Sequence, residues 1–392
     1  MGRLIRCQQS RDLLLGAALT LSALSLMVWP QQAMQAMRDG LSLCCNVIVP
    51  SLFPFFVLSS LTVELGLSRY LGRLLEPIMV PLFRVNGACA TALALGFVGG
   101  YPVGARTAIG LYQNGQCTKD EAERLLAFCN NCGPAFILGV VGTGVFGSSA
   151  AGLFLYAGHI LASLLVGFIF RFYGQKDTQT SSRTHADFHT CGAAEAFARS
   201  VTGAMGSLLN ICAFILFFSV LLRMLTLSGV LSTLAGLLST LFAPVGMTLP
   251  WAERLLTGLL ELSSGVSTLS QGALSGRLSM AAFMLGWAGL SVHCQVMAFL
   301  GDSGLSLGPY AAGKLLHALF SSLIVGGLVR LFPLDQAVSA YLAQQTETIV
   351  LLDFYQALSI ASAAAWATWV VFFLLALLAV KKSSRKRLRS VL

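Results

Sequence analysis

Two apolar stretches, 87–113 and 125–142, restrict the fold of this chain more than any other feature. Glycine and proline interrupt the first between Gly99 and Gly104, and Asn130–Pro134 interrupts the second. A helix that crosses a bilayer alone avoids such residues, because each freed backbone polar group must find a partner. Broken helices at membrane depth persist where they are buried in protein or line a cavity. The two stretches therefore predict a polytopic membrane protein with a binding site inside it.

The composition agrees with a membrane protein. The chain is 56% hydrophobic and 10% charged, whereas a soluble domain carries about 25% charged residues. Several apolar runs approach the roughly 20 residues that a spanning helix needs. The net charge of +9 is concentrated at the two ends, which indicates cytoplasmic termini and not a nucleic-acid partner. The basic C-terminal tail is also expected to contact anionic lipid.

The order of segments repeats along the chain. We divide the chain into an N-terminal helix with an amphipathic lead-in (1–40), a first repeat (41–172), a polar cytoplasmic linker (173–200), a second repeat (201–332) and a C-terminal helix with a basic tail (333–392). The sequence of 157–165 resembles that of 312–320, which supports an internal duplication. The apolar run at 13–29 is long for the core of a signal peptide, so we favour a retained helix.

The broken stretches have equivalents in the second half. Residues 87–113 are predicted to form a re-entrant hairpin, followed by a polar loop at 113–124 and the broken span 125–142. Residues 252–275 and 279–300 are the corresponding hairpin and broken span. We predict an all-α protein with about eight transmembrane helices and two hairpins. Complete spans are expected at 13–29, 43–65, 149–172, 203–224, 308–331 and 354–379, and 68–86 is expected to lie in the membrane interface.

Charge predicts how the two halves are oriented. With both termini cytoplasmic, the basic residues in outside segments are restricted to Arg38, Arg223, Arg254, Arg277 and Arg330. This asymmetry satisfies the positive-inside rule. The first repeat then begins by crossing inward and the second by crossing outward. The sequence therefore predicts inverted-topology repeats, the arrangement of many secondary transporters, with the binding site where the broken helices meet.

Arg106 is the most informative polar residue. It lies two residues after the Gly99–Gly104 tip, in the first turn of the second half-helix. An arginine in a membrane segment costs about 2.5–3.5 kcal/mol on insertion scales. Beside a helix N-terminus, a guanidinium can hold a carboxylate through two hydrogen bonds. The alternatives are that Arg106 extends to the cytoplasmic surface or pairs with a glutamate. Tyr101, within the tip, can stack on a planar ligand.

The second hairpin offers an acid and hydroxyls at the equivalent depth. Glu261 is predicted either to bind a coupling proton or sodium ion or to neutralise Arg106. Ser263 and Ser264 follow it directly. Their hydroxyls are expected to cap the second half-helix or to bind a substrate oxygen.

The two broken spans supply further candidate ligands. Asn130 and Asn131 can donate to and accept from a substrate, or can satisfy the backbone groups that the break frees. Ser291, His293 and Gln295 occupy the matching place in the second half. For His293, hydrogen-bonded packing is the competing interpretation.

Catalysis finds no support in the sequence. Motifs for hydrolysis, metal binding or phosphate binding lack a suitable context, so we predict that the protein is not an enzyme and has no cofactor or metal site. The candidate coupling ion for transport is Na⁺ or H⁺. Cys129 and Cys132 have the spacing of a redox or zinc site but lack a second ligand pair. His159, Lys314 and His317 lie in the duplicated tails, and no role is predicted for them.

Four stretches of the sequence resemble a known family. Residues 46–57, 99–106, 121–139 and 289–295 are similar to the YlbJ-type sporulation integral membrane proteins, which contain paired nucleoside-recognition (Gate) domains. The resemblance implies a fold like that of concentrative nucleoside transporters and a multi-pass location in a bacterial cell membrane. It also implies a role in spore formation, in a mother-cell-derived membrane of the sporulating cell.

Three functions are consistent with these observations. The first is transport of a small planar organic anion, with dipicolinic acid as the candidate, because its two carboxylates and ring suit Arg106 and Tyr101. The second is transport of a nucleoside or nucleobase, for which Gln295, the asparagines and the hydroxyls would matter more. The third is a non-transporting sporulation membrane scaffold. The expected partners are the organic anion and the lipid bilayer, and a homo-oligomer is compatible with all three functions.

Overall fold

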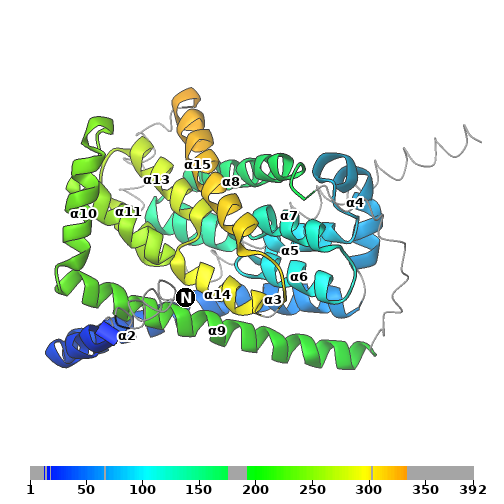
Figure 1. The fold of residues 1–392 in the computed structure, drawn as a ribbon, viewed down its shortest axis with the longest axis horizontal. Coiled ribbons are helices and arrows are strands. Elements are labelled where there is room, and N and C mark those ends of the chain that lie inside the picture. Colours follow the sequence, from blue (N-terminus) through cyan, green and yellow to red (C-terminus); the bar gives the residue numbers. More distant parts are fainter. Residues whose placement is uncertain are drawn as a thin grey trace, which may run out of the picture.

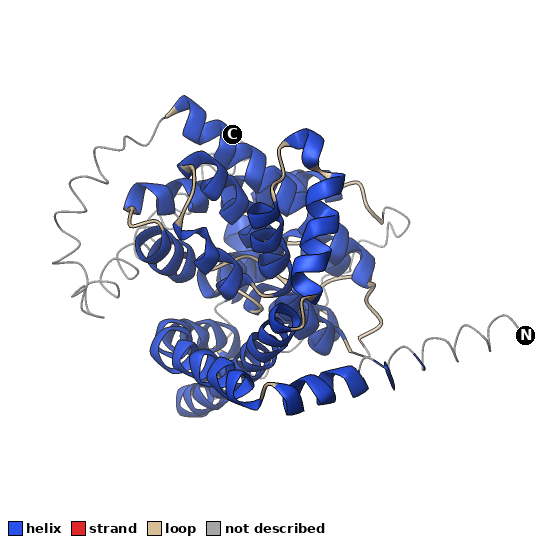
Figure 2. Ribbon diagram, turned by 90° about the vertical axis from the view of Figure 1, so that its left-hand side faces the viewer, coloured by secondary structure: helices blue, strands red, loops and turns tan. Residues whose placement is uncertain are grey.

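The structure is a computed structural model that describes residues 13, 16–17, 19–65, 68–174, 192–301 and 303–332. Every regular element within these ranges is a helix (Figure 2). The predicted span at 354–379 and most of the polar linker lie outside the described residues. The all-α prediction is confirmed for the part of the chain that the structure describes.

The helices follow the same order twice. Helix α2 (Pro30–Leu43) lies mostly in the predicted lead-in, and the predicted first repeat continues with the π-helical η1 (Cys44–Ile48), α3 (Val49–Glu64), α4 (Ser68–Phe83), α5 (Cys89–Gly99), α6 (Val103–Gln113), α7 (Lys119–Cys129), the π-helical η2 (Ala135–Val145) and α8 (Ser149–Phe170). The second consists of α9 (Ala193–Leu227), α10 (Val230–Leu241), η3 (Ala243–Val245), α11 (Leu249–Leu260), α12 (Leu262–Ser267), η4 (Thr268–Ser270), α13 (Leu274–Trp287), α14 (Leu290–Leu300) and α15 (Leu307–Leu331). The two hairpins are thus α5–α6 and α11–α12, and the two broken spans are α7–η2 and α13–α14.

Several helices are suited to a membrane. Four helical segments of the described chain are long and apolar enough to cross it, namely Ser149–Phe170, Ala193–Leu227, Leu274–Leu300 and Leu307–Leu331. Figure 1 shows the longest of them, α9, along one edge of the molecule. Its inner face packs on η1 and α3 through a cluster that includes Cys44, Ile48, Leu208 and Ile211. Many of the leucines and phenylalanines on the outer faces of α8, α9 and α15 are exposed, as expected for contact with lipid.

The last helices of the two predicted repeats, α8 and α15, run in opposite directions. Phe154, near the start of α8, has its ring 6.5 Å from that of Phe332, just past the end of α15. At the other end, Tyr173 follows α8 and Ser306 precedes α15, and both bond to Glu123 of α7. Helices α8 and α15 are therefore antiparallel. This orientation is the one that an inverted repeat requires.

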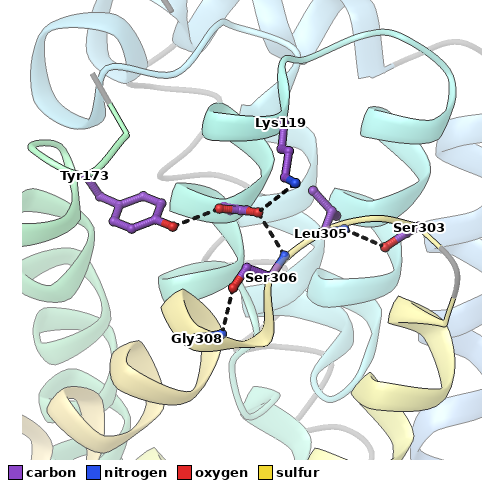
Figure 3. Close-up of polar contacts among 7 residues, drawn as sticks. Lys119, Tyr173, Ser303, Leu305, Ser306 and Gly308 are labelled. Atoms are coloured by element: carbon purple, nitrogen blue, oxygen red, sulfur yellow. Dashed lines mark hydrogen bonds and ion pairs between the residues drawn. The ribbon is translucent and has the colours of Figure 1, made fainter. Parts of the chain in front are cut away.

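Glu123 connects α7 to the end of α8 and to the start of α15 through polar contacts (Figure 3). Its carboxylate accepts hydrogen bonds from the Tyr173 hydroxyl at 2.9 Å and from the Ser306 backbone N–H at 2.8 Å, and it lies 3.9 Å from the Lys119 Nζ. Burial first, and the bond to Glu123 second, raise the pKa of the Tyr173 phenol above its ordinary value. The three contacts join α7, the end of α8 and the start of α15.

Two predicted boundaries are wrong. The segment predicted as a loop at 113–124 contains the first turns of α7, which begins at Lys119. The reason is a capping box, in which the Thr118 side chain accepts from the Glu121 N–H and the Glu121 carboxylate accepts from the Thr118 N–H. Helix α9 likewise begins at Ala193, so the end of the polar linker at 173–200 is helical.

Close backbone contact holds the first hairpin against the broken span. A Cβ atom on Gly96 would lie 1.8 Å from the Cys129 carbonyl oxygen, and one on Gly104 would lie 2.0 Å from the same atom. Gly96 belongs to α5 and Gly104 to α6, so both arms of the hairpin touch the last residue of α7. Only glycine permits this approach. The contact fixes where the tip, residues 100–102, lies relative to the break at 130–134.

Candidate functional site

The two hairpin tips and the two broken spans meet around one small cavity. The cavity has a volume of about 70 Å³. Tyr101 of the first tip and Glu261 of the second both line it, although 160 residues of sequence separate them. The other predicted site residues on its wall are Ser263, Ser291 and Gln295. Five residues predicted from the sequence are thus brought together in a single place.

Glu261 acts as the cap of a half-helix. Its two carboxylate oxygens accept from the backbone N–H groups of Ser263 at 2.9 Å and Ser264 at 2.6 Å, at the start of α12. The predicted capping by serine hydroxyls is therefore wrong, because the carboxylate already satisfies these donors. The predicted pairing of Glu261 with Arg106 is also wrong, because the two side chains face different cavities. The role of Glu261 as an ion-coupling residue stays a prediction.

Arg106 lines a second and larger cavity, of about 320 Å³. Its guanidinium donates to the Ser207 hydroxyl of α9 and lies 5.9 Å from the centre of the Phe299 ring of α14. Both contacts come from the second repeat, whereas Arg106 belongs to the first. The start of α6, Pro102 and Val103, lines the same cavity, and no side chain caps that helix end. The wall also carries one carboxylate, that of Glu64.

The two asparagines of the break lie behind the small cavity and not on its wall. Asn130 is 1% exposed and Asn131 is 0% exposed. The Asn131 amide donates to the Phe128 carbonyl oxygen at 2.9 Å, and the Ser163 hydroxyl donates to the same oxygen at 2.7 Å. Asn131 therefore satisfies a freed backbone carbonyl, which was one of its two predicted roles. Ligand contact by either asparagine stays a prediction.

Lys314 is the residue that the sequence analysis missed. It is 1% exposed, and its Nζ donates to the Asn130 carbonyl oxygen at 3.1 Å and to the Tyr101 hydroxyl at 3.0 Å. The ammonium also lies 4.7 Å from the centre of the Tyr101 ring. The Tyr101 hydroxyl in turn donates to the Leu285 carbonyl oxygen of α13 at 2.5 Å. The sequence signal that could have identified Lys314 is the same one that identified Arg106, namely a basic residue inside an apolar helix.

Three buried histidines surround this centre. The His159 Nε2 accepts from the backbone N–H of Cys132 at 3.0 Å, so this imidazole is neutral with its proton on Nδ1. The ring of His317 lies 4.3 Å from that of His159, centre to centre. His293 bonds to the Tyr310 hydroxyl at 2.9 Å through Nδ1 and does not line either cavity. Its contact with a substrate stays a prediction.

No cluster of three or more histidine, cysteine or acidic side chains suitable for a metal ion occurs among the described residues. Cys129 and Cys132, the pair with redox spacing, are both buried and free.

Comparison with known proteins connects this architecture to a family. Residues 46–170 match the family described as nucleoside recognition (Gate). The sporulation integral membrane protein YlbJ of Bacillus subtilis is 35% identical over 320 residues, which cover 76% of this chain and 77% of that protein.

Solved structures of CNTnw are also similar to this chain. A doubly substituted variant in an outward-facing state is 16% identical, with a TM-score of 0.49, and covers 82% of this chain and 87% of its own. An inward-facing, substrate-bound state of the same protein gives a TM-score of 0.42 at 15% identity, over 81% of this chain and 85% of its own. With an identity of 35% over three quarters of both chains, it is the relationship to YlbJ that decides the assignment. The chain belongs to the family of the sporulation integral membrane protein YlbJ.

Proposed function

We propose that this protein is a secondary transporter that moves a small planar organic anion across a membrane during spore formation, with dipicolinic acid as the candidate substrate. The observation that carries the proposal is the Arg106 guanidinium in a cavity of about 320 Å³ between the two repeats. This volume lies within the range of about 300–1,000 Å³ that is usual for small-molecule sites. The role in spore formation is inferred from the relationship to the sporulation integral membrane protein YlbJ.

Three features of the cavity suit a planar anion. The guanidinium of Arg106 can bind a carboxylate through two hydrogen bonds, and only one described side chain, Ser207, accepts from it. The uncapped start of α6 adds a positive dipole end beside it. The Phe299 ring, on the opposite repeat, offers an aromatic surface for a flat ligand. Tyr101, also predicted to stack on a planar ligand, lines the small cavity and bonds through its hydroxyl to Lys314 and Leu285, and its stacking stays a prediction.

The position of the cavity supports transport over simple binding. Its walls come from α3, α5 and α6 of the first repeat and from α9 and α14 of the second. Equivalent helices of the repeats are antiparallel, so a movement of one repeat against the other would change the walls of the cavity on both sides. A scaffold protein would need neither the two broken spans nor an arginine, exposed as Arg106 is, on the wall of a cavity between the repeats.

Uptake by proteoliposomes tests the proposal. We expect the wild-type protein to accumulate labelled dipicolinate, and we expect Arg106→Ala to weaken its apparent affinity about 10- to 150-fold, the worth of one charge-assisted hydrogen-bonded pair. Arg199→Ala is the matched control, because Arg199 lies on α9 and pairs on the surface with Glu195 at 2.6 Å. If the wild type and Arg106→Ala take up dipicolinate equally well, Arg106 does not bind the substrate.

A nucleoside is the second candidate substrate, and one observation favours it. The small cavity between the hairpin tips is lined by Gln295, Ser263, Ser291 and the Glu261 carboxylate. These groups suit a neutral ligand rich in hydroxyl and amide groups, and the cavity, of about 70 Å³, would have to widen to hold a nucleoside. The test is binding of labelled uridine. Displacement by unlabelled uridine and not by dipicolinate, together with a lower affinity for uridine in Gln295→Ala, would establish this alternative.

A further inference from the structure

The break in α7–η2 is closed by one residue from the tail of each repeat. Lys314 of α15 and His159 of α8 occupy equivalent positions in the duplicated tails 312–320 and 157–165. Both reach the break of the first repeat. The His159 ring accepts from the freed N–H of Cys132, and the Lys314 ammonium donates to the freed carbonyl of Asn130. Of the two equivalent positions, one therefore provides a hydrogen-bond acceptor and the other a donor to backbone groups of the same break.

Carbonyl groups that are freed in a broken membrane helix are the usual ligands of a coupling cation such as sodium. In this chain the side-chain nitrogen of Lys314 already occupies that carbonyl, since the Lys314 Nζ is 3.1 Å from the Asn130 oxygen and 3.0 Å from the Tyr101 oxygen. The face of the Tyr101 ring is a third electron-rich partner, at 4.7 Å. Within the described part of the chain, no carboxylate lies within 4.0 Å of this ammonium. Lys314 is therefore held by neutral oxygens, as an alkali-metal ion would be.

We propose that Lys314 is a built-in cation of this transporter, which occupies the ion position at the helix break, so that the protein needs no sodium ion there. A sodium ion on the Asn130 carbonyl would lie close to the ammonium. At a separation of about 4 Å, repulsion between two unit charges lowers the affinity by about three orders of magnitude at an effective dielectric constant near 20. The tether also joins the repeats, because Lys314 belongs to the second and both of its partners belong to the first.

Thermal unfolding of the purified protein in different salts tests the proposal without requiring a known substrate. The apparent Tm is measured in about 100 mM NaCl and in the same concentration of choline chloride. For the wild type we expect no difference between the salts. For Lys314→Ala we expect a lower Tm in choline chloride and a rise of about 2 °C in NaCl, as for a new site with a Kd near 10 mM.

His159→Ala is the matched control. This substitution empties the other half of the same break, but it exposes the N–H of Cys132, which repels a cation. We expect a lower Tm with no rescue by sodium. Should Lys314→Ala not yield folded protein, Lys314→Ser takes its place, because the serine hydroxyl can satisfy part of the vacated position.

Each outcome decides the inference. A sodium-dependent rise of Tm in the wild type would overturn it, because the ion position would then be open. Equal Tm values for Lys314→Ala in the two salts would also overturn it, because the break would not be a cation position. One expectation rests on the proposed function, namely that uptake of the substrate by the wild type is equal in choline chloride and in NaCl. If no substrate is transported, the Tm measurements still decide the cation site.

Discussion

Replacement of one glycine in the first hairpin is expected to destabilise the protein far more than replacement of another in the same helix. Gly104 and Gly110 both belong to α6. A Cβ atom on Gly104 would lie 2.0 Å from the Cys129 carbonyl oxygen and 2.8 Å from the carbonyl carbon, whereas a Cβ atom on Gly110 would have no neighbour within 4 Å. Alanine at 104 must therefore displace a backbone, and alanine at 110 displaces nothing.

The expected effects differ in sign. A contact of 2.0 Å must open by more than 1 Å to reach an ordinary distance, and the atom in the way belongs to the backbone, not to a flexible side chain. We expect Gly104→Ala to cost about 3 kcal/mol or more, at the upper end of the range for overpacked cores. Gly110→Ala should instead gain about 0.5–1 kcal/mol, because alanine loses less conformational entropy in a helix than glycine does.

Thermal unfolding of the purified variants checks this pair. At roughly 1–2 °C per kcal/mol for a chain of this length, Gly104→Ala should lower the Tm by about 3–6 °C, and Gly110→Ala should leave it equal or slightly raised. Because Gly104 lies two residues from Arg106, the same variant should also weaken dipicolinate binding. A Gly104→Ala protein as stable as wild type would show that the hairpin does not lie against Cys129, and would refute the reasoning.

Two further predictions concern single contacts. Glu261→Gln keeps one acceptor for the start of α12 and loses the other, so it should lower the free energy of unfolding by about 0.5–2 kcal/mol. Dipicolinate binding that depends on Arg106 should change less than about twofold. A loss of binding as large as that of Arg106→Ala would mean that the anion binds beside Glu261. Tyr173→Phe should lower the Tm at neutral pH, because the phenol bonds to Glu123. Since the pKa of Tyr173 is raised, that stabilisation is complete below the ordinary value of about 10 and is lost as the pH rises through the raised pKa. The Tm values of wild type and Tyr173→Phe should therefore converge at alkaline pH, and a constant difference up to about pH 11 would contradict this.

Much of the fold follows from local signals in the sequence. The tip at 99–104 and the break at 130–134 are visible as glycine, proline and polar residues within apolar runs, and the structure ends α5 at Gly99 and α7 at Cys129. The duplication is visible because 157–165 and 312–320 still resemble each other. The start of α7 was missed because the capping box at Thr118 and Glu121 lies in a polar segment with no apolar period.

The partners of polar side chains are harder to predict. Opposite charges and equivalent depth make a pair of Arg106 and Glu261 one of the two predicted alternatives for Glu261. In the structure each of them has a different neighbour, Ser207 for Arg106 and the backbone of α12 for Glu261. Both neighbours depend on how two distant segments pack, which no spacing in the sequence encodes. Lys314 was passed over for the same reason, because its acceptors lie in a hairpin tip and a helix break of the other repeat.

The two repeats share a scaffold but no longer share its chemistry. The first break, at 130–134, has buried asparagines, a lysine and a histidine around it, whereas the second passes through Ala288 and Gly289, both with positive φ. At the tips, Tyr101 and Glu261 are in equivalent places, and one carries a neutral hydroxyl while the other carries a carboxylate. Exact symmetry would create two equal sites and, by repulsion between like charges, would disfavour filling both. Arg106 lies in the first hairpin and Lys314 bonds to the first break, so under the proposed function an anion would be attracted to that side of the repeat interface. The second repeat supplies the opposite wall of the larger cavity, where Ser207 and Phe299 contact Arg106.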